Sequence, residues 1–200
     1  MGDPEIIRNA ELNLGDIYLR LGDLDRAQQY LEKVYQDAQQ HGTWGEEWMK
    51  WRYSQHLAHS LGELWLTKGD ADQALQFAQT CLTLAEPTAS RKNLVKGWRL
   101  LGQALLAQGQ RAQAEEALDR ALTIGRDIGN PPQLWQTYQA LGALYEQRAE
   151  LLRSHAAYQN ALDVIAGMAA QLHDPDLKQT FLVAQPVQQI RESLARTDLP

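Results

Sequence analysis

Apolar residues return along this chain at helical spacing, in a unit that recurs about every forty residues. One face of residues 94–105 carries large apolar side chains at the i, i+4, i+7, i+11 spacing of an α-helix: Leu94, Trp98, Leu101 and Leu105. Gly109 interrupts this series. A second apolar series then begins: Ala114, Leu118, Ala121 and Leu122. The pattern predicts two helices joined by a short turn.

The same unit recurs on both sides of this stretch. The Leu101-Gly102 pair returns forty residues later as Leu141-Gly142 and forty residues earlier as Leu61-Gly62. A further step of forty-seven residues reaches Leu14-Gly15. Small residues at fixed places let helix axes approach closely. A two-helix unit cannot bury its apolar face alone, so such units stack on their neighbours. The sequence therefore predicts an all-α fold, an α-solenoid of about four helix hairpins.

These residues resemble the tetratricopeptide repeat family. Its pattern is a large residue, Leu-Gly, an aromatic, a turn Gly, then Ala, a large residue and Ala. The third unit follows this pattern at Trp98, Leu101-Gly102, Gly109, Ala114, Leu118 and Ala121, with Leu105 in place of the aromatic. In the fourth unit, Ala149 replaces the turn Gly and Ser154 replaces the Ala. The resemblance covers roughly residues 5 to 170 and is closest to the long-repeat variants. It implies a right-handed solenoid with a concave groove.

Helix signals divide the chain into four repeats followed by a tail. The repeats are predicted at about 4–41, 44–87, 88–129 and 131–171, and capping helices at 174–197. Within them we expect helices at about 4–21, 23–40, 44–68, 71–86, 89–108, 110–129, 132–148 and 151–170. The Asp174-Pro175 pair is a typical helix start. Residues 161–187 also resemble the end of long-repeat domains in large bacterial signalling proteins. We therefore expect this domain to belong to such a regulatory protein.

Composition restricts the function classes. The chain has 200 residues, of which 22% are charged, and a net charge of −6. This balance argues against nucleic-acid binding. No apolar run approaches the roughly 18 residues that a membrane span needs, and no signal peptide is recognisable. Cys81 is the only cysteine, so no intrachain disulfide can form. We predict a cytoplasmic protein without nucleic-acid or membrane contacts.

No group of residues predicts catalysis or a cofactor. Cys81 occupies the small-residue position that Ala121 fills in the next unit, which favours a buried structural thiol over a nucleophile. His56 and His59 could share a helix face, but two histidines without a third ligand make a poor metal site. The sequence therefore predicts a protein that is not an enzyme and binds no metal. A tryptophan stripe extends the second unit and is either buried core or an exposed platform: Trp44, Trp48 and Trp51.

The resemblance also implies a partner-binding groove. In the family, the groove is lined by first-helix residues about six and three before the Leu-Gly glycine, and one, four and five after it. The candidates at these positions are His56, His59, Glu63, Lys96, Arg99, Gln103, Gln136 and Gln139, with Asn9, Asp16, Arg20, Thr67, Glu146 and Gln147 as further positions. Arg52 and Lys92, one turn upstream, extend them to a basic band with Lys96 and Arg99. The asparagines of the family's terminal-carboxylate clamp are missing, because Ser60, Glu63, Leu100 and Gln103 stand in their places.

The groove candidates support more than one function. The basic ones could hold the carboxylates of a protein or peptide partner by charge-assisted hydrogen bonds. The plainer interpretation is that they are solvated charges on exposed helix faces. Tryptophan, glutamine and histidine side chains would also suit a small polar ligand such as a sugar. No polar capping helix precedes the first unit, so self-association through the N-terminal end is a third possibility.

Overall fold

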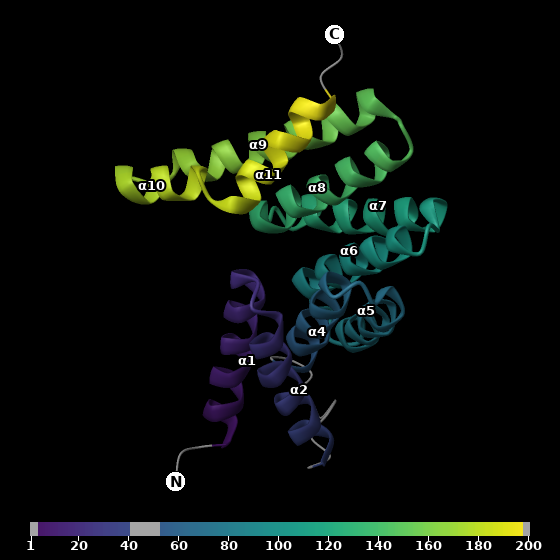
Figure 1. Ribbon diagram of the computed structural model, residues 1–200, viewed down its shortest axis with the longest axis vertical. Coiled ribbons are helices and arrows are strands. Elements are labelled where there is room, and N and C mark those ends of the chain that lie inside the picture. Colours follow the sequence, from purple (N-terminus) through teal and green to yellow (C-terminus); the bar gives the residue numbers. More distant parts are fainter. Residues whose placement is uncertain (1–3, 41–52, 198–200) are drawn as a thin grey trace.

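The computed structural model describes residues 4–40 and 53–197, and this part of the chain is helical without a strand (Figure 1). The helices are α1 (Pro4–Leu21), α2 (Leu24–Gln40), α4 (Gln55–Thr67), α5 (Ala71–Ala85), α6 (Arg91–Ala107), α7 (Arg111–Asp127), α8 (Pro131–Gln147), α9 (Leu151–Ala170), α10 (Pro175–Leu182) and α11 (Gln185–Thr197). The predicted α-solenoid is confirmed. Trp44, Trp48, Trp51 and Arg52 lie outside the described residues.

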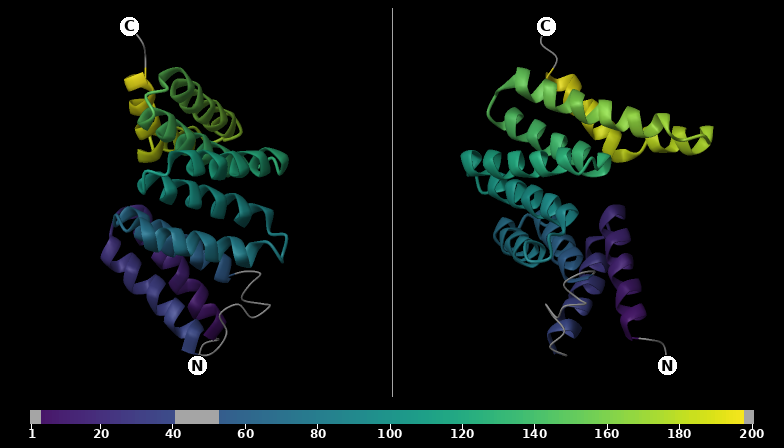
Figure 2. Two further views of the ribbon diagram at one scale, coloured as in Figure 1. Left: turned by 90° about the vertical axis from the view of Figure 1, so that its right-hand side faces the viewer. Right: turned by 180° about the vertical axis from the view of Figure 1, so that it is seen from behind.

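Successive helices pair as hairpins that stack along the chain. The pairs are α1 with α2, α4 with α5, α6 with α7, and α8 with α9, and each pair packs mainly on the next (Figures 1 and 2). The helices predicted from the sequence match to within a few residues wherever both ends are described. The division into four family repeats remains a prediction, as do its residue boundaries. Among the described helices none is both long and apolar enough to cross a membrane.

Local chemistry explains where individual helices begin. The Asn130 side chain caps α8 by accepting a hydrogen bond from the backbone N–H of Gln133. Asp70 caps α5 in the same way through the backbone N–H of Gln73. Pro131 then opens α8, one residue earlier than predicted, because proline suits the first turn of a helix.

The turn inside each hairpin requires a left-handed backbone. Gly22, Gly69 and Gly109 have φ values of 78°, 86° and 77°. Ala149 holds the same place in the fourth hairpin with a φ of 58°. Alanine adopts this region at a cost of about 1–2 kcal/mol because its Cβ crowds the following carbonyl oxygen. Loss of the glycine from the sequence pattern therefore does not alter the turn.

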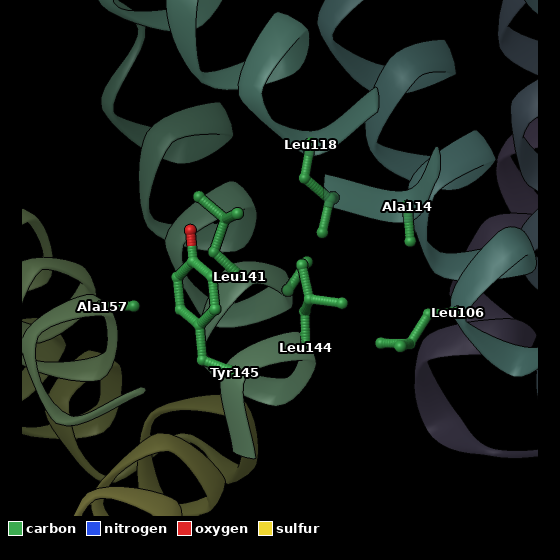
Figure 3. Packing of buried hydrophobic residues seen from close by; sticks show 8 residues of the cluster. Leu106, Ala114, Leu118, Leu141, Leu144, Tyr145 and Ala157 are labelled. Carbon is green, nitrogen blue, oxygen red and sulfur yellow. The ribbon is translucent and has the colours of Figure 1, made fainter. Parts of the chain in front are cut away.

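Close helix contacts within the hairpins depend on the Leu-Gly glycines. A Cβ placed on Gly102 would lie 2.6 Å from Cγ of Leu118 and 3.1 Å from the backbone oxygen of Ala114. Leu118 belongs to a cluster that α6, α7, α8 and α9 build together around Leu144 and Tyr145 (Figure 3). The predicted role of the small residues is thus confirmed, because the neighbouring helix fills the space that a side chain would need.

Polar contacts fix the two hairpins that carry most of the basic candidates. The Gln55 side chain of α4 is buried and its Nε2 donates a 3.0 Å hydrogen bond to the backbone oxygen of Leu84. Asn93 of α6 donates a 2.7 Å hydrogen bond to Oε1 of Gln55. Buried and paired amides of this kind define one arrangement of neighbouring helices. The relative positions of α4 and α6 are therefore specified.

The tail packs on the last hairpin. Val187 and Ile190 of α11 are buried with Tyr158 and Ile165 of α9. Helix α10 has no fully buried residue, and Leu177, which the sequence placed on its apolar series, is exposed. Helix α11 thus supplies the fully buried cover of the last hairpin, and Phe181 and Leu182 of α10 pack against the same cluster partly buried.

Candidate functional site

A groove of about 770 Å³ runs along the first helices of the hairpins. Nine of the ten sequence candidates lie in its wall: His56, His59, Glu63, Lys92, Lys96, Arg99, Gln103, Gln136 and Gln139. Helix α1 and helix α10 of the tail lie on the same side of the stacked hairpins (Figure 1). Both α1 and the α10–α11 tail contribute residues to the groove wall. The tenth candidate, Arg52, is outside the described residues.

One wall of the groove is basic. Lys92, Lys96 and Arg99 occur at spacings of four and three residues on α6, which places them on one helix face. Arg20 enters the same groove from α1. Within residues 4–40 and 53–197, none of these four side chains has a carboxylate within 4.0 Å. The wall therefore carries positive charge that the described protein does not neutralise by direct pairing.

Arg99 is the deepest of these cations. Its side chain is only 2% exposed, and Nη1 donates a 2.7 Å hydrogen bond to Oε1 of Gln133 on α8. Burial lowers the pKa of Arg99, although the nearby Glu63 carboxylate opposes this effect. A guanidinium has five N–H donors, and a buried charge without an ionic partner costs free energy. Arg99 thus has unused capacity to bind an anion.

His59 is buried beside Arg99 and is neutral. Its ring is 4% exposed, and Nε2 makes no hydrogen bond. Oε1 of Glu63 lies 3.4 Å from that nitrogen, but the pair lacks hydrogen-bond geometry. Burial lowers the pKa of His59 well below its usual value, and the charges of Lys96 and Arg99 lower it further. The groove therefore contains an unsatisfied imidazole nitrogen next to its cations.

Glu63 brings a carboxylate to the same place. Its side chain is 40% exposed, on the side that faces the groove, and is otherwise enclosed by protein. This enclosure raises the pKa of Glu63, even though Arg99 and Lys96 favour the ionised form. The other acid of this region, Asp16, is already engaged with Nε2 of His56. Among the described residues, Glu63 is thus the carboxylate of the groove that neither accepts a side-chain hydrogen bond nor pairs with a lysine or arginine within 4.0 Å.

The Asp16–His56 contact joins α1 to α4 across the groove wall. Burial alone would raise the pKa of Asp16. Hydrogen bonds from His56 and Ser60, together with the charge of Lys96, outweigh burial and lower this pKa. Asp16 therefore stays ionised at neutral pH, and its charge is used within the protein. Asp16 consequently offers the lysines of α6 no free carboxylate.

Amide and apolar side chains line the rest of the groove. Gln103 continues the basic face of α6, and on α8 Gln136 and Gln139 are joined by Trp135 and by Gln133, which the family positions did not identify. The tail contributes further residues that the repeat period could not reveal: Phe181, Pro186 and Gln189. Gln133 lies one turn before Gln136 on the same helix face, and this spacing was the available signal. The tail residues carried no such signal because they lie beyond the repeats.

Some candidate positions serve other purposes. Glu146 is not in the groove wall, since its carboxylate accepts hydrogen bonds from Tyr158 at 2.9 Å and from Arg196 at 3.1 Å. Asn9 and Gln147 also lie outside the wall. Cys81 is buried, and burial raises the pKa of its thiol to about 12, so it is protonated at neutral pH. No cluster of three or more metal-ligating side chains occurs among the described residues.

Comparisons with known proteins identify the repeat. Family models described as tetratricopeptide repeat match residues 12–36, 55–80 and 98–132. No curated protein matches the chain.

Solved structures share the fold at low sequence identity. A Podosopora anserina putative kinesin light chain with nearly identical TPR-like repeats has a TM-score of 0.61 and 18% identity, over 98% of this chain and 97% of that one. BtubC (BKLC) from P. vanneervenii has a TM-score of 0.58 and 19% identity, over 92% of this chain and 72% of that one. Pseudomonas aeruginosa pilF has a TM-score of 0.55 and 19% identity, over 98% and 78%. These structures show the fold alone. Stacked hairpins with the Leu-Gly pattern and three matching family models lead to one conclusion: the chain is a tetratricopeptide repeat protein.

Proposed function

We propose that this protein is a non-catalytic interaction module that binds an acidic peptide or an acidic segment of a partner protein in its concave groove. The observation that carries the proposal is the row of Lys92, Lys96 and Arg99 on α6, which faces the groove without a carboxylate within 4.0 Å among the described residues. The chain as a whole has a net charge of −6, so this positive wall is a local feature. A partner with carboxylates would complement it.

Binding of an acidic peptide is expected to weaken strongly when the charges of Lys92 and Lys96, the two accessible cations of the wall, are reversed. Lys92→Glu with Lys96→Glu should weaken binding of a labelled hexaglutamate peptide by roughly a hundredfold, since each lost charge-assisted contact contributes on the order of 1.5 kcal/mol. Arg99 is left unchanged because it is buried and a glutamate there would damage the fold. Fluorescence anisotropy at low ionic strength measures the affinity.

A matched pair of charge reversals separates a groove effect from a net-charge effect. Arg111 and Arg191 are exposed and lie outside the groove wall, so Arg111→Glu with Arg191→Glu changes the net charge equally. This control should bind the peptide nearly as the wild type does. Equal affinity of all three proteins, with equal helicity by circular dichroism, would place the function elsewhere than in the groove.

The amide side chains of the groove support a second candidate function. Gln103, Gln136 and Gln139 with Trp135 offer hydrogen-bonding groups and an aromatic face, which suit a small polar ligand such as an inducer. This ligand would contact α8 more than the lysines, so its binding would survive the Lys92→Glu, Lys96→Glu change. Either function fits a domain of a larger bacterial regulatory protein. The resemblance of residues 161–187 to such proteins supports that context.

Self-association is a further candidate, and α1 is the surface that favours it. Ile7, Leu14 and Leu21 recur every seven residues, with Ile17 between them, and all four are exposed. We expect wild-type protein to dimerise as its concentration rises and Ile17→Lys to remain monomeric, because a charge in such a seam opposes helix pairing. Sedimentation velocity over a wide concentration range measures this. A wild type that stays monomeric throughout would remove the candidate.

A further inference from the structure

The carboxylate of Glu63 stands where a partner's carboxylate would be expected to bind. It shares the groove with Lys96 and Arg99, whose charges act on it, and its Oε1 lies 3.4 Å from the unsatisfied Nε2 of His59. No side-chain hydrogen bond to it occurs among the described residues. The protein thus has its own anion beside the cations of the groove, and that anion is held loosely.

We propose that Glu63 is an internal competitor that sets the affinity of the groove for acidic partners, because its charge must be neutralised or displaced before a partner carboxylate reaches Arg99 and Lys96. This inference rests on the proposed function and adds a regulatory residue to it. Two carboxylates near one guanidinium repel each other, and the repulsion is strong in a partly enclosed site. Binding of a partner therefore favours protonation of Glu63 or its movement toward solvent.

Proton uptake is the readier of the two routes. Enclosure already raises the pKa of Glu63, and an incoming anion raises it further. The charged and titratable groups that face Glu63 are Asp16 and Arg20 on α1, His56 and His59 on α4, and Lys92, Lys96 and Arg99 on α6. Helix α8 adds only amides to this region of the wall, Gln133 and Gln136. Lower pH therefore promotes the form of the groove that accepts an acidic partner.

The test compares hexaglutamate binding by the wild type and by Glu63→Gln. The neutral, isosteric glutamine should bind the peptide roughly tenfold more tightly at about pH 8, where the wild-type carboxylate is ionised. This ratio should shrink as the pH is lowered to about 5.5, where the peptide's glutamates remain mostly ionised.

Two further variants distinguish the possible outcomes: a matched control, Glu116→Gln, and the Lys92→Glu, Lys96→Glu protein described above. Glu116 is an exposed carboxylate of α7 outside the groove, so Glu116→Gln changes the charge equally and should bind as the wild type does. If the peptide binds in a manner that depends on Lys92 and Lys96, but Glu63→Gln gives no gain or a gain independent of pH, the competitor role is wrong and the proposed function stands. If neither the wild type nor Glu63→Gln binds hexaglutamate at low salt, both proposals fail.

Discussion

Leu118→Ala is expected to lower the free energy of unfolding by about 2–5 kcal/mol, as large-to-small changes in well-packed cores do. Leu118 is fully buried, and its side chain fills the space beside Gly102 in the central hairpin. Its removal leaves a cavity between α6 and α7, in a cluster that also supports α8 (Figure 3). Urea denaturation followed by circular dichroism measures the change.

A double-mutant cycle tests the close contact itself. Gly102→Ala alone should be destabilising, because its Cβ would lie 2.6 Å from Cγ of Leu118. Combined with Leu118→Ala, the same methyl group enters the vacated space, so the two costs should be less than additive. Additive costs would show that Gly102 is needed for another reason, such as its 3.1 Å approach to the backbone oxygen of Ala114. The exposed Gln113→Ala provides a nearby reference with little expected effect.

Arg99→Met is expected to uncouple binding from stability. The guanidinium is buried against one amide, Gln133, so an apolar side chain of similar length removes a costly buried charge but also the donor to Oε1 of Gln133; the two effects oppose each other, and the unfolding free energy should change by no more than about 1–2 kcal/mol. Affinity for hexaglutamate should nevertheless fall severalfold or more, because the deepest cation of the groove is lost. Urea denaturation and fluorescence anisotropy on the same preparation give both quantities.

The opposite pattern would assign Arg99 a purely structural role. Strong destabilisation of Arg99→Met without a change in peptide affinity at equal helicity would show that the Arg99–Gln133 contact holds α6 to α8 and does no more. Arg99→Glu serves as the reference for a damaging change. It places a buried carboxylate near Glu63 and should cost about 3 kcal/mol or more. If Arg99 lowers stability but is needed for binding, it is an example of the common trade-off between stability and function.

The sequence predicted most of the groove because its signals are local. The spacing of Lys92, Lys96 and Arg99 is enough to place them on one helix face. The Leu-Gly pairs indicate which face of each first helix packs on the next helix. Position within the repeat, extended one turn upstream to Lys92, therefore placed nine candidates around one groove. It did not distinguish the buried Arg99 from the exposed Lys92, since both lie on the same face. The contact of Arg99 with Gln133 on the next hairpin is likewise not visible in the spacing along α6.

By itself, the sequence determined the helices, their pairing into hairpins and the family, since these depend on residues a few positions or one repeat apart. Only the tertiary structure decided how α1, α4, α6, α8 and the tail converge on one groove. This convergence depends on the accumulated rotation between successive hairpins, which no local sequence pattern specifies. For the same reason, the sequence could not reveal that Glu146 is engaged by Arg196, fifty residues away, or that Glu63 is close enough to Arg99 to feel its charge yet accepts no side-chain hydrogen bond from the described residues.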